Sequence, residues 1–180
     1  DLYLTKKGHN VTSVSPGEIP DFLSWMPGVS KMLNYEENES DAIAALEAAE
    51  LIFCVDFNDF SRTKHLEKAL TDATQPKIIR DHHRYPKPVW NYGMSRPEKS
   101  STSEMVYDFI NLMCDNELID LDIAACLYTG LMTDTGSFKF PVTSASAHNM
   151  AADLKHKGLD HTRIHEEVYD SWTEGRTRFL

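Results

Sequence analysis

The chain has 180 residues, which suits one domain or most of one, and its 41% hydrophobic content is an ordinary value for a globular protein. A formal net charge of −10 argues against the coating of long nucleic acids, which requires a basic face. No apolar run approaches the roughly 20 residues that span a membrane. The three cysteines lack cysteine-rich spacing, so we expect buried, reduced thiols in a cytoplasmic protein.

The first half of the chain alternates between predicted helices and strands. Lys6 and Lys7 followed by Gly8 indicate the end of a helix, because cations and a left-handed glycine both suit helix C-termini. Ser40 is the expected N-cap of an alanine- and glutamate-rich helix. The pattern predicts helices at residues 1–8, 41–49 and 63–70, and strands at 10–14, 51–55 and 77–80. Residues 20–28 are expected to form an irregular segment with a short helix.

The second half is predicted to be mainly helical. Residues 84–100 contain three prolines and a glycine, which predicts a loop. Ser101 and Glu104 fit the capping-box pattern at the start of a helix. The predicted helices cover residues 102–113, residues 120–133, a segment from a cap at Thr143 or Ser144 to residue 155, and residues 160–171. Strands alternating with helices predict an α/β fold with a mostly parallel sheet flanked by helices.

Polar side chains follow two of the predicted strands. Asp56 comes directly after the first apolar run, and the triplet Asp81-His82-His83 comes directly after the next one. Ligands of open α/β sheets bind just outside the carboxyl ends of the strands, so these side chains are expected to lie close together. Asp134, between two threonines, supplies a further carboxylate. The combination predicts a carboxylate–imidazole metal site for phosphate ester chemistry.

Each of these residues also has an ordinary structural interpretation. Asp56 alone is more often a helix cap or turn residue, since Asn58 and Asp59 follow it. A histidine pair alone fits a polar turn. Asp134 alone fits a turn at the C-terminus of a helix. The helix dipole disfavours a carboxylate there, and a bound metal would supply the compensating cation. The association of all three elements favours the metal site over the separate interpretations.

A polar run precedes the helix that is expected to begin near residue 102. Ser100, Ser101 and Thr102 lie where free backbone N–H groups attract anions, so they are candidates for contact with a substrate phosphate. Simple capping of the helix explains the same residues equally well.

These elements together resemble the DHH phosphoesterase family. The matching segments are Val55-Asp56, Asp81-His82-His83 and the run from Asp134 to Phe138. The run from Ser100 to Glu104 further resembles the bacterial nanoRNase and pAp-phosphatase branch of that family. The resemblance covers essentially the whole chain and implies a Rossmann-like catalytic domain.

The resemblance implies a role for each candidate residue. Asp56 would bridge two divalent ions, usually Mn²⁺ with Mg²⁺ as an alternative, and His82 and Asp134 would complete the shell of the second ion. His83 would contact the scissile phosphate, and Asp81 would orient a neighbouring histidine. The reaction would be a two-metal hydrolysis.

Two parts of the family pattern are not found in residues 1–180. These are the first motif, with its histidine and aspartates, and the smaller substrate-binding domain with a glycine-rich motif. We therefore expect these 180 residues to form a single catalytic domain that lacks its first strand and its second domain. On its own, such a segment is expected to bind one metal weakly and to turn over little.

The leading functional hypothesis is hydrolysis of short oligoribonucleotides, linear dinucleotides or 3′,5′-bisphosphorylated adenosine. The first alternative is a manganese-dependent pyrophosphatase or polyphosphatase, which shares the motifs but does not bind a base. The second is a nucleotide or metal sensor without catalysis. Neither a membrane nor a long duplex nucleic acid is an expected partner, and a homodimer is a possible assembly.

Overall fold

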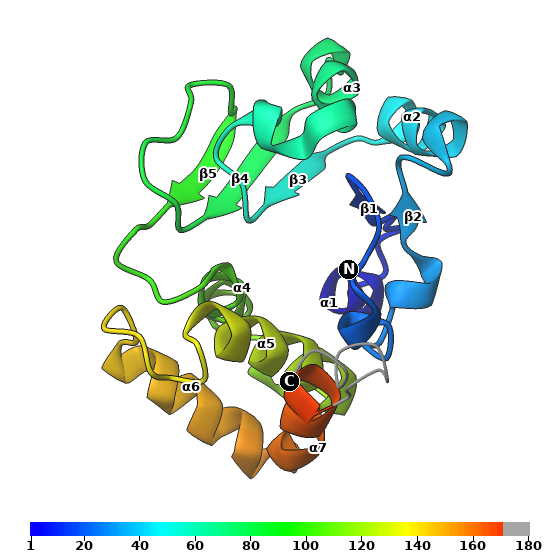
Figure 1. Cartoon of the computed structure of the whole chain (residues 1–180). Coiled ribbons are helices and arrows are strands. Elements are labelled where there is room, and N and C mark those ends of the chain that lie inside the picture. The colour runs from blue at the N-terminus through cyan, green and yellow to red at the C-terminus, as the bar shows by residue number, and fades with distance from the viewer. Residues whose placement is uncertain (171–180) are drawn as a thin grey trace, which may run out of the picture.

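The computed structural model describes residues 1–170 and contains two parallel sheets with helices around them (Figure 1). The strands are β1 (Val14–Ser15), β2 (Leu33–Asn34), β3 (Ile52–Val55), β4 (Lys77–Asp81) and β5 (Tyr92–Ser95). The α-helices are α1 (Leu2–Lys6), α2 (Glu39–Ala48), α3 (Glu67–Asp72), α4 (Thr102–Leu112), α5 (Leu121–Asp134), α6 (Ala145–His156) and α7 (His161–His165). The α/β class and the parallel pairing predicted from the sequence are both confirmed.

The three-stranded sheet has the order β3-β4-β5, with every neighbouring pair parallel. The register aligns Cys54 with Ile79, and Ile79 with Gly93, so the three strands end at one edge. The short strands β1 and β2 form a separate parallel pair. The β3–β4 connection, residues 56–76, carries the 3₁₀ helix η3 (Phe60–Leu66) and α3, whereas the β4–β5 connection, residues 82–91, contains no helix.

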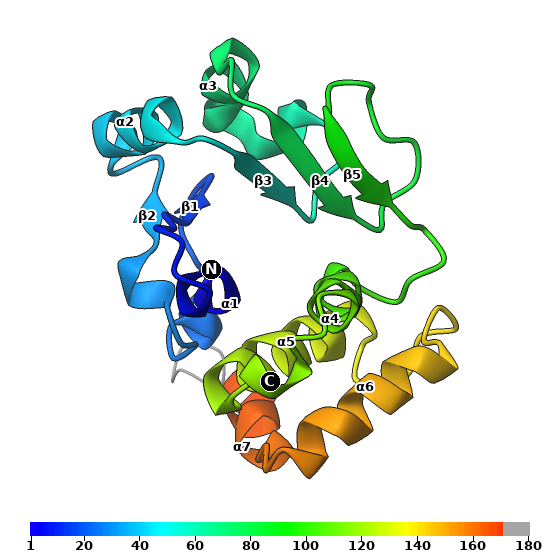
Figure 2. The ribbon, with the colours of Figure 1, turned by 180° about the vertical axis from the view of Figure 1, so that it is seen from behind.

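Two hydrophobic clusters hold the fold together. One lies between the three-stranded sheet and the η3–α3 segment, and its buried members include Ile52, Cys54, Phe60 and Leu66. The larger cluster lies among the helices, with fully buried residues such as Leu131, Met132, Met150 and Leu154. Figures 1 and 2 show α4 to α7 as a helical layer on the side of the sheet opposite α3.

Local capping sets the start of four helices in the second half. The side chains of Ser101, Asp120, Ser144 and Asp160 each accept a hydrogen bond from a backbone N–H in the first turn. These caps satisfy donors that the helix itself leaves free. The predicted starts of α4 and α5 and the cap at Ser144 are therefore confirmed.

Several predicted boundaries are wrong, mostly where pairing between distant segments decides the structure. The loop predicted at 84–100 contains the edge strand β5. The strand predicted at 10–14 is limited to Val14–Ser15, and β2 was not predicted. Ser40 is not a cap, because α2 begins at Glu39 after Asn38. The helix predicted at 63–70 is instead η3 followed by α3, with a kink at Lys64, whose φ is 52°.

The C-terminal helix begins after the predicted cap at Asp160 but changes type along its length. The α-helical part ends at His165 and continues as a single π-helical turn, Glu166–Asp170, while position 171 lies outside the described residues. Among residues 1–170, none of the helices is long and apolar enough to cross a membrane.

All three cysteines are free thiols. Cys54 is buried and Cys126 is partly buried, but Cys114 is exposed, so the prediction of burial is wrong for Cys114. Cys114 follows the end of α4 with a left-handed φ of 58°, in a turn beyond the apolar face of that helix. The cytoplasmic location inferred from the thiols stays a prediction.

Candidate metal centre

Asp56 lies at the first turn beyond β3 in an unusual backbone conformation. Its φ is 69°, in the left-handed region that non-glycine residues rarely adopt. Its N–H donates to the carbonyl of Arg80 at 3.0 Å, so the β3–β4 ladder continues up to the site. The carboxylate is 54% exposed, and its Oδ1 accepts a hydrogen bond from Thr102 Oγ1 at 2.8 Å. Such an exposed carboxylate has acceptor capacity left for a cation.

His82 and Asp134 approach this carboxylate from two other elements. His82 follows β4, and its Nε2 lies 3.7 Å from Oδ1 of Asp56 and 3.8 Å from Oδ2 of Asp134. Asp134 is the last residue of α5. The other ring nitrogen of His82, Nδ1, lies 3.4 Å from the carbonyl of Lys99. If Nδ1 carries the proton toward that carbonyl, Nε2 keeps its lone pair for the space between the two carboxylates.

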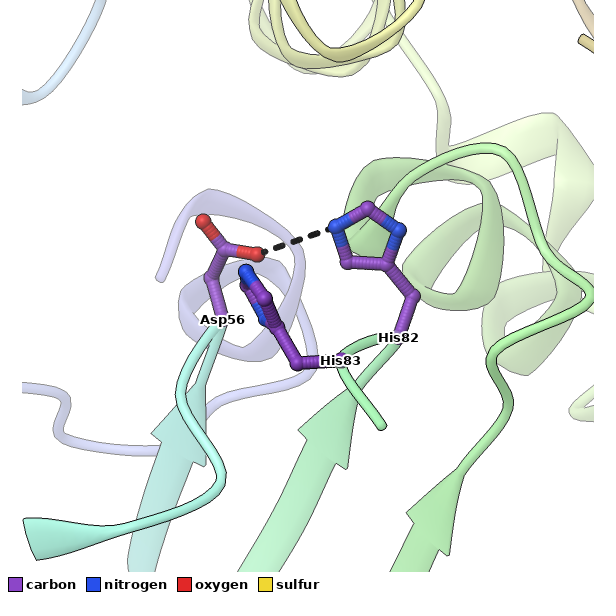
Figure 3. A group of neighbouring side chains, drawn as sticks. All are labelled: Asp56, His82 and His83. Carbon is purple, nitrogen blue, oxygen red and sulfur yellow. Dashed lines mark ion pairs between the residues drawn. The ribbon is translucent and has the colours of Figure 1, made fainter. Parts of the chain in front are cut away.

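His83 is held by the fully buried carboxylate of Asp81. Oδ1 of Asp81 lies 2.7 Å from Nδ1 of His83, and Oδ2 accepts the His83 backbone N–H at 2.9 Å. This pair of contacts fixes the ring and favours a proton on Nδ1. Figure 3 shows the side chains of Asp56, His82 and His83 projecting from the ends of β3 and β4 toward a shared space.

The electrostatics at Asp134 favour a positive charge in that space. Burial and the nearby charge of Asp56 raise the pKa of Asp134 to about 6, and His82 and His83 partly oppose the increase. In the metal-free protein, the carboxylates of Asp134 and Asp56 therefore repel each other, and little positive charge nearby compensates them. A bound cation would relieve this repulsion, as would protonation of Asp134.

The donor set fits a divalent metal. Ligand atoms of Asp56, His82 and His83 all lie within 4.8 Å of one another, and Asp134 adds a carboxylate next to His82. Mixed imidazole and carboxylate ligands suit Mn²⁺ better than a structural zinc ion, which favours thiolates. The site brings together four of the residues singled out from the sequence, with Asp81 directly behind them.

The three polar residues before α4 have different surroundings. Ser100 and Ser101 are fully buried: Ser100 Oγ donates to the carbonyl of Val142 at 3.0 Å, and Ser101 Oγ caps Glu104. The contact to Glu104 favours the capping interpretation for Ser101, whereas the Ser100 hydroxyl joins this segment to the start of α6. Thr102 alone reaches the centre, through its hydrogen bond to Asp56. Contact of any of the three with a substrate stays a prediction.

Two residues of the site were missed in the sequence. Arg62, on η3, places its guanidinium 3.3 Å from Nε2 of His83. Glu104 is 1% exposed and accepts hydrogen bonds from the N–H of Ser100 at 2.8 Å and from Lys99 Nζ at 3.1 Å. It thereby fixes the segment whose Lys99 carbonyl faces His82. Arg62 carries no motif signal, whereas the capping-box position of Glu104 was visible.

A comparison with protein families identifies the chain. The model of the DHH family, N-terminal domain, matches residues 3–131, and the chain belongs to that family. DHH family phosphoesterases are hydrolases that act on phosphoester or phosphoanhydride bonds.

Individual relatives differ in what their names describe. The chain is 28% identical over 159 residues to the bifunctional oligoribonuclease and PAP phosphatase NrnA of Thermus thermophilus, which covers 88% of this chain and 44% of the relative. It is 32% identical over 120 residues to a probable manganese-dependent inorganic pyrophosphatase of Streptococcus equi subsp. equi, covering 62% of this chain and 34% of the relative.

A solved structure matches almost the whole chain. The crystal structure of an exopolyphosphatase-related protein from Bacteroides fragilis superposes with a TM-score of 0.95 at 35% identity. The match covers 98% of this chain and 52% of the other. The chain thus spans about half the length, or less, of the relatives it matches, and their names do not agree on one substrate.

Proposed function

We propose that this chain is the metal-binding catalytic domain of a phosphoesterase that hydrolyses short oligoribonucleotides, linear dinucleotides or 3′,5′-bisphosphorylated adenosine. The observation that carries the proposal is the convergence of Asp56 and Asp134 on His82 Nε2, each within 4 Å. Three separate elements supply these groups, and the raised pKa of Asp134 indicates that the site favours an added cation.

In the proposed site, Asp56, His82 and Asp134 would hold the divalent cations, Mn²⁺ or Mg²⁺. When bound, such ions supply a nucleophile at neutral pH and neutralise charge that develops on the phosphoryl group. The contact of His82 Nδ1 with the Lys99 carbonyl supports the assignment of Nε2 as the ligand atom.

His83 is the proposed contact to the scissile phosphate. Asp81 positions this ring and keeps Nδ1 protonated, so that Nε2 is the atom available to the reacting group. Arg62, 3.3 Å from that Nε2, adds a positive charge at the same place. The Arg62 guanidinium is well placed to bind an anionic oxygen in front of the metal site, and His83 can donate to the same oxygen when Nε2 also carries a proton.

We favour the nucleotide hypothesis over the pyrophosphate hypothesis because the oligoribonuclease and PAP phosphatase relative aligns with 88% of this chain, whereas the pyrophosphatase relative aligns with 62%. The second candidate is a manganese-dependent pyrophosphatase. It is favoured by the higher identity, 32% against 28%, and by the exopolyphosphatase-related neighbour.

The test uses the full-length protein with Mn²⁺, since the chain spans 44% of the Thermus relative. Three reactions are measured: release of mononucleotide from a diribonucleotide, and release of phosphate from 3′,5′-bisphosphorylated adenosine and from pyrophosphate. Asp56→Asn is the inactivating variant, and Asp72→Asn, at a surface carboxylate that pairs with Lys68, is the matched control.

Nucleotide hydrolysis that Asp56→Asn abolishes and Asp72→Asn preserves would support the leading proposal. Hydrolysis confined to pyrophosphate would replace it with the second candidate. Manganese binding without turnover of any of the three substrates would instead favour the sensor hypothesis.

A further inference from the structure

Apart from the metal centre, a pocket of about 180 Å³ lies between the sheet and α4. Its apolar wall consists of Met94 from β5 and Met105, Phe109 and Leu112 from α4. None of the residues of the metal centre lines it. Figure 2 shows β4, β5 and the segment that leads from β5 into α4, and residues of these elements line the pocket.

Arg80 of β4 enters this pocket without a counter-charge. Its guanidinium lies over the ring of Phe109, 5.1 Å from the centroid, and its Nε is buried without a hydrogen-bond partner. Within residues 1–170, no carboxylate forms an ion pair with it. Burial lowers the pKa of Arg80. A buried donor without an acceptor is destabilising, so the fold bears a cost at this position.

The other charges around the pocket are already compensated. Arg96 pairs with Glu98 at 3.2 Å, and Lys99 pairs with Asp108 at 2.6 Å. Arg80 therefore provides the one positive charge among these lining residues that lacks a partner. A single negative charge would match this single unpaired cation, whereas a dianion such as phosphate would bring a second charge that faces the carboxylates of Glu98 and Asp108.

We propose that this pocket binds a short aliphatic monocarboxylate, with the carboxylate on the guanidinium of Arg80 and the chain against the four apolar side chains. A guanidinium offers parallel donors that match the two oxygens of a carboxylate. A volume of about 180 Å³ admits a small molecule with a short chain. Butanoate, a monocarboxylate with a three-carbon apolar chain, serves as the probe.

Two backbone contacts connect this pocket to the metal centre. The carbonyl of Arg80 accepts the N–H of Asp56 at 3.0 Å, and the carbonyl of Lys99 faces His82 Nδ1 at 3.4 Å. A ligand that holds Arg80 and Lys99 in place would also hold the backbone carbonyls that contact Asp56 and His82, two of the proposed metal ligands. Occupancy is therefore expected to change Mn²⁺ affinity, a consequence that rests on the proposed function, whereas binding itself does not.

The test is an amide NMR titration of the metal-free protein with butanoate, with butylammonium and inorganic phosphate as comparison probes. Butanoate is expected to bind saturably, with a Kd on the order of 1 mM and shifts concentrated at Arg80, Met94 and Leu112. Arg80→Met is expected to weaken binding at least ten-fold and to raise the Tm of the ligand-free protein, because it removes a buried Nε donor that has no acceptor.

A second variant keeps the proposal testable if Arg80→Met fails to fold. Leu112 lines the pocket and is 72% exposed, so Leu112→Trp should fold, and its larger side chain is expected to narrow the pocket and weaken butanoate binding. Arg163→Met, at an exposed arginine of α7, is the control and should bind butanoate unchanged.

The proposal is overturned if butanoate produces no saturable chemical-shift changes at concentrations well above the expected Kd. Equal binding by the wild type and both pocket variants would also overturn it, as would tighter binding of phosphate or butylammonium. Because neither metal nor substrate is present, these results are independent of whether the protein hydrolyses a phosphoester.

Discussion

Asp134→Asn offers a direct test of the electrostatic argument for the metal centre. The carboxyl of Asp134 is raised from its ordinary pKa of 3.8 to about 6, first by burial and then by the charge of Asp56. In the metal-free protein at neutral pH, ionised Asp134 therefore destabilises the fold. Asparagine keeps the shape and removes the charge, so we expect the metal-free variant to be more stable than the wild type.

The size of this effect follows from the pKa difference. A change of about two pKa units corresponds to about 3 kcal/mol, because each unit is worth about 1.4 kcal/mol. The side chain is 30% exposed, and solvent screening reduces the expected gain to about 1–2 kcal/mol. For a chain of this length, that predicts a Tm increase of about 2–8 °C.

The pH dependence has a defined sign. The raised pKa means that the folded state binds the proton of Asp134 more tightly than the unfolded state does. Its stabilising contribution is full below pH 3.8 and is lost as the pH rises through about 6. The advantage of Asp134→Asn should therefore be largest at neutral pH and should fade as the pH falls from 6 toward 3.8.

Thermal unfolding of both proteins, with chelator and then with Mn²⁺, checks these expectations. Manganese should stabilise the wild type by about 2.7 kcal/mol at 100 times its Kd, and the variant by less. Asp72→Asn, at an exposed carboxylate, controls for a general change in net charge. A metal-free Asp134→Asn protein that is less stable than the wild type at neutral pH would refute the reasoning.

Three further substitutions test the parts of the fold that position the site. Asp81→Asn removes the carboxylate that holds His83 Nδ1 at 2.7 Å, so kcat should fall at least ten-fold and the ring tautomer should change in nitrogen NMR spectra; an unchanged tautomer would contradict the positioning role. Thr102→Val removes the 2.8 Å hydrogen bond to Asp56 and should weaken Mn²⁺ binding several-fold by calorimetry, while equal affinity would show that this contact is dispensable. Gly93→Ala should cost about 2–4 kcal/mol in urea unfolding, because φ is +120° and a Cβ would lie 2.1 Å from the carbonyl oxygen of Ile79; a loss below about 1 kcal/mol would mean that β5 shifts freely.

The features determined by short segments of sequence were predicted well. The apolar runs of β3 and β4 are buried on one face, and helices α4 and α5 begin at Ser101 and Asp120, whose side chains cap them. Caps and apolar periodicity act over a few residues, so they are visible without a fold. The placement of Asp56 and Asp81-His82-His83 at adjacent strand ends followed from the parallel sheet.

Other features required the tertiary structure. Strand β5 is exposed along most of its length and contains Gly93, so only its pairing with β4 makes it a strand. Arg62 approaches His83 because of the η3 path rather than a motif.

The same division applies to the metal centre. Sequence alone determined the kinds of ligand, and it placed Asp56 at the end of one strand and Asp81-His82-His83 at the end of the next. The approach of Asp134 to His82, and the burial that raises the pKa of Asp134, were decided by the packing of α5 against α4, which in turn contacts β4. Distances between chain-remote groups and the dielectric around them depend on contacts formed throughout the fold, and no short segment encodes them.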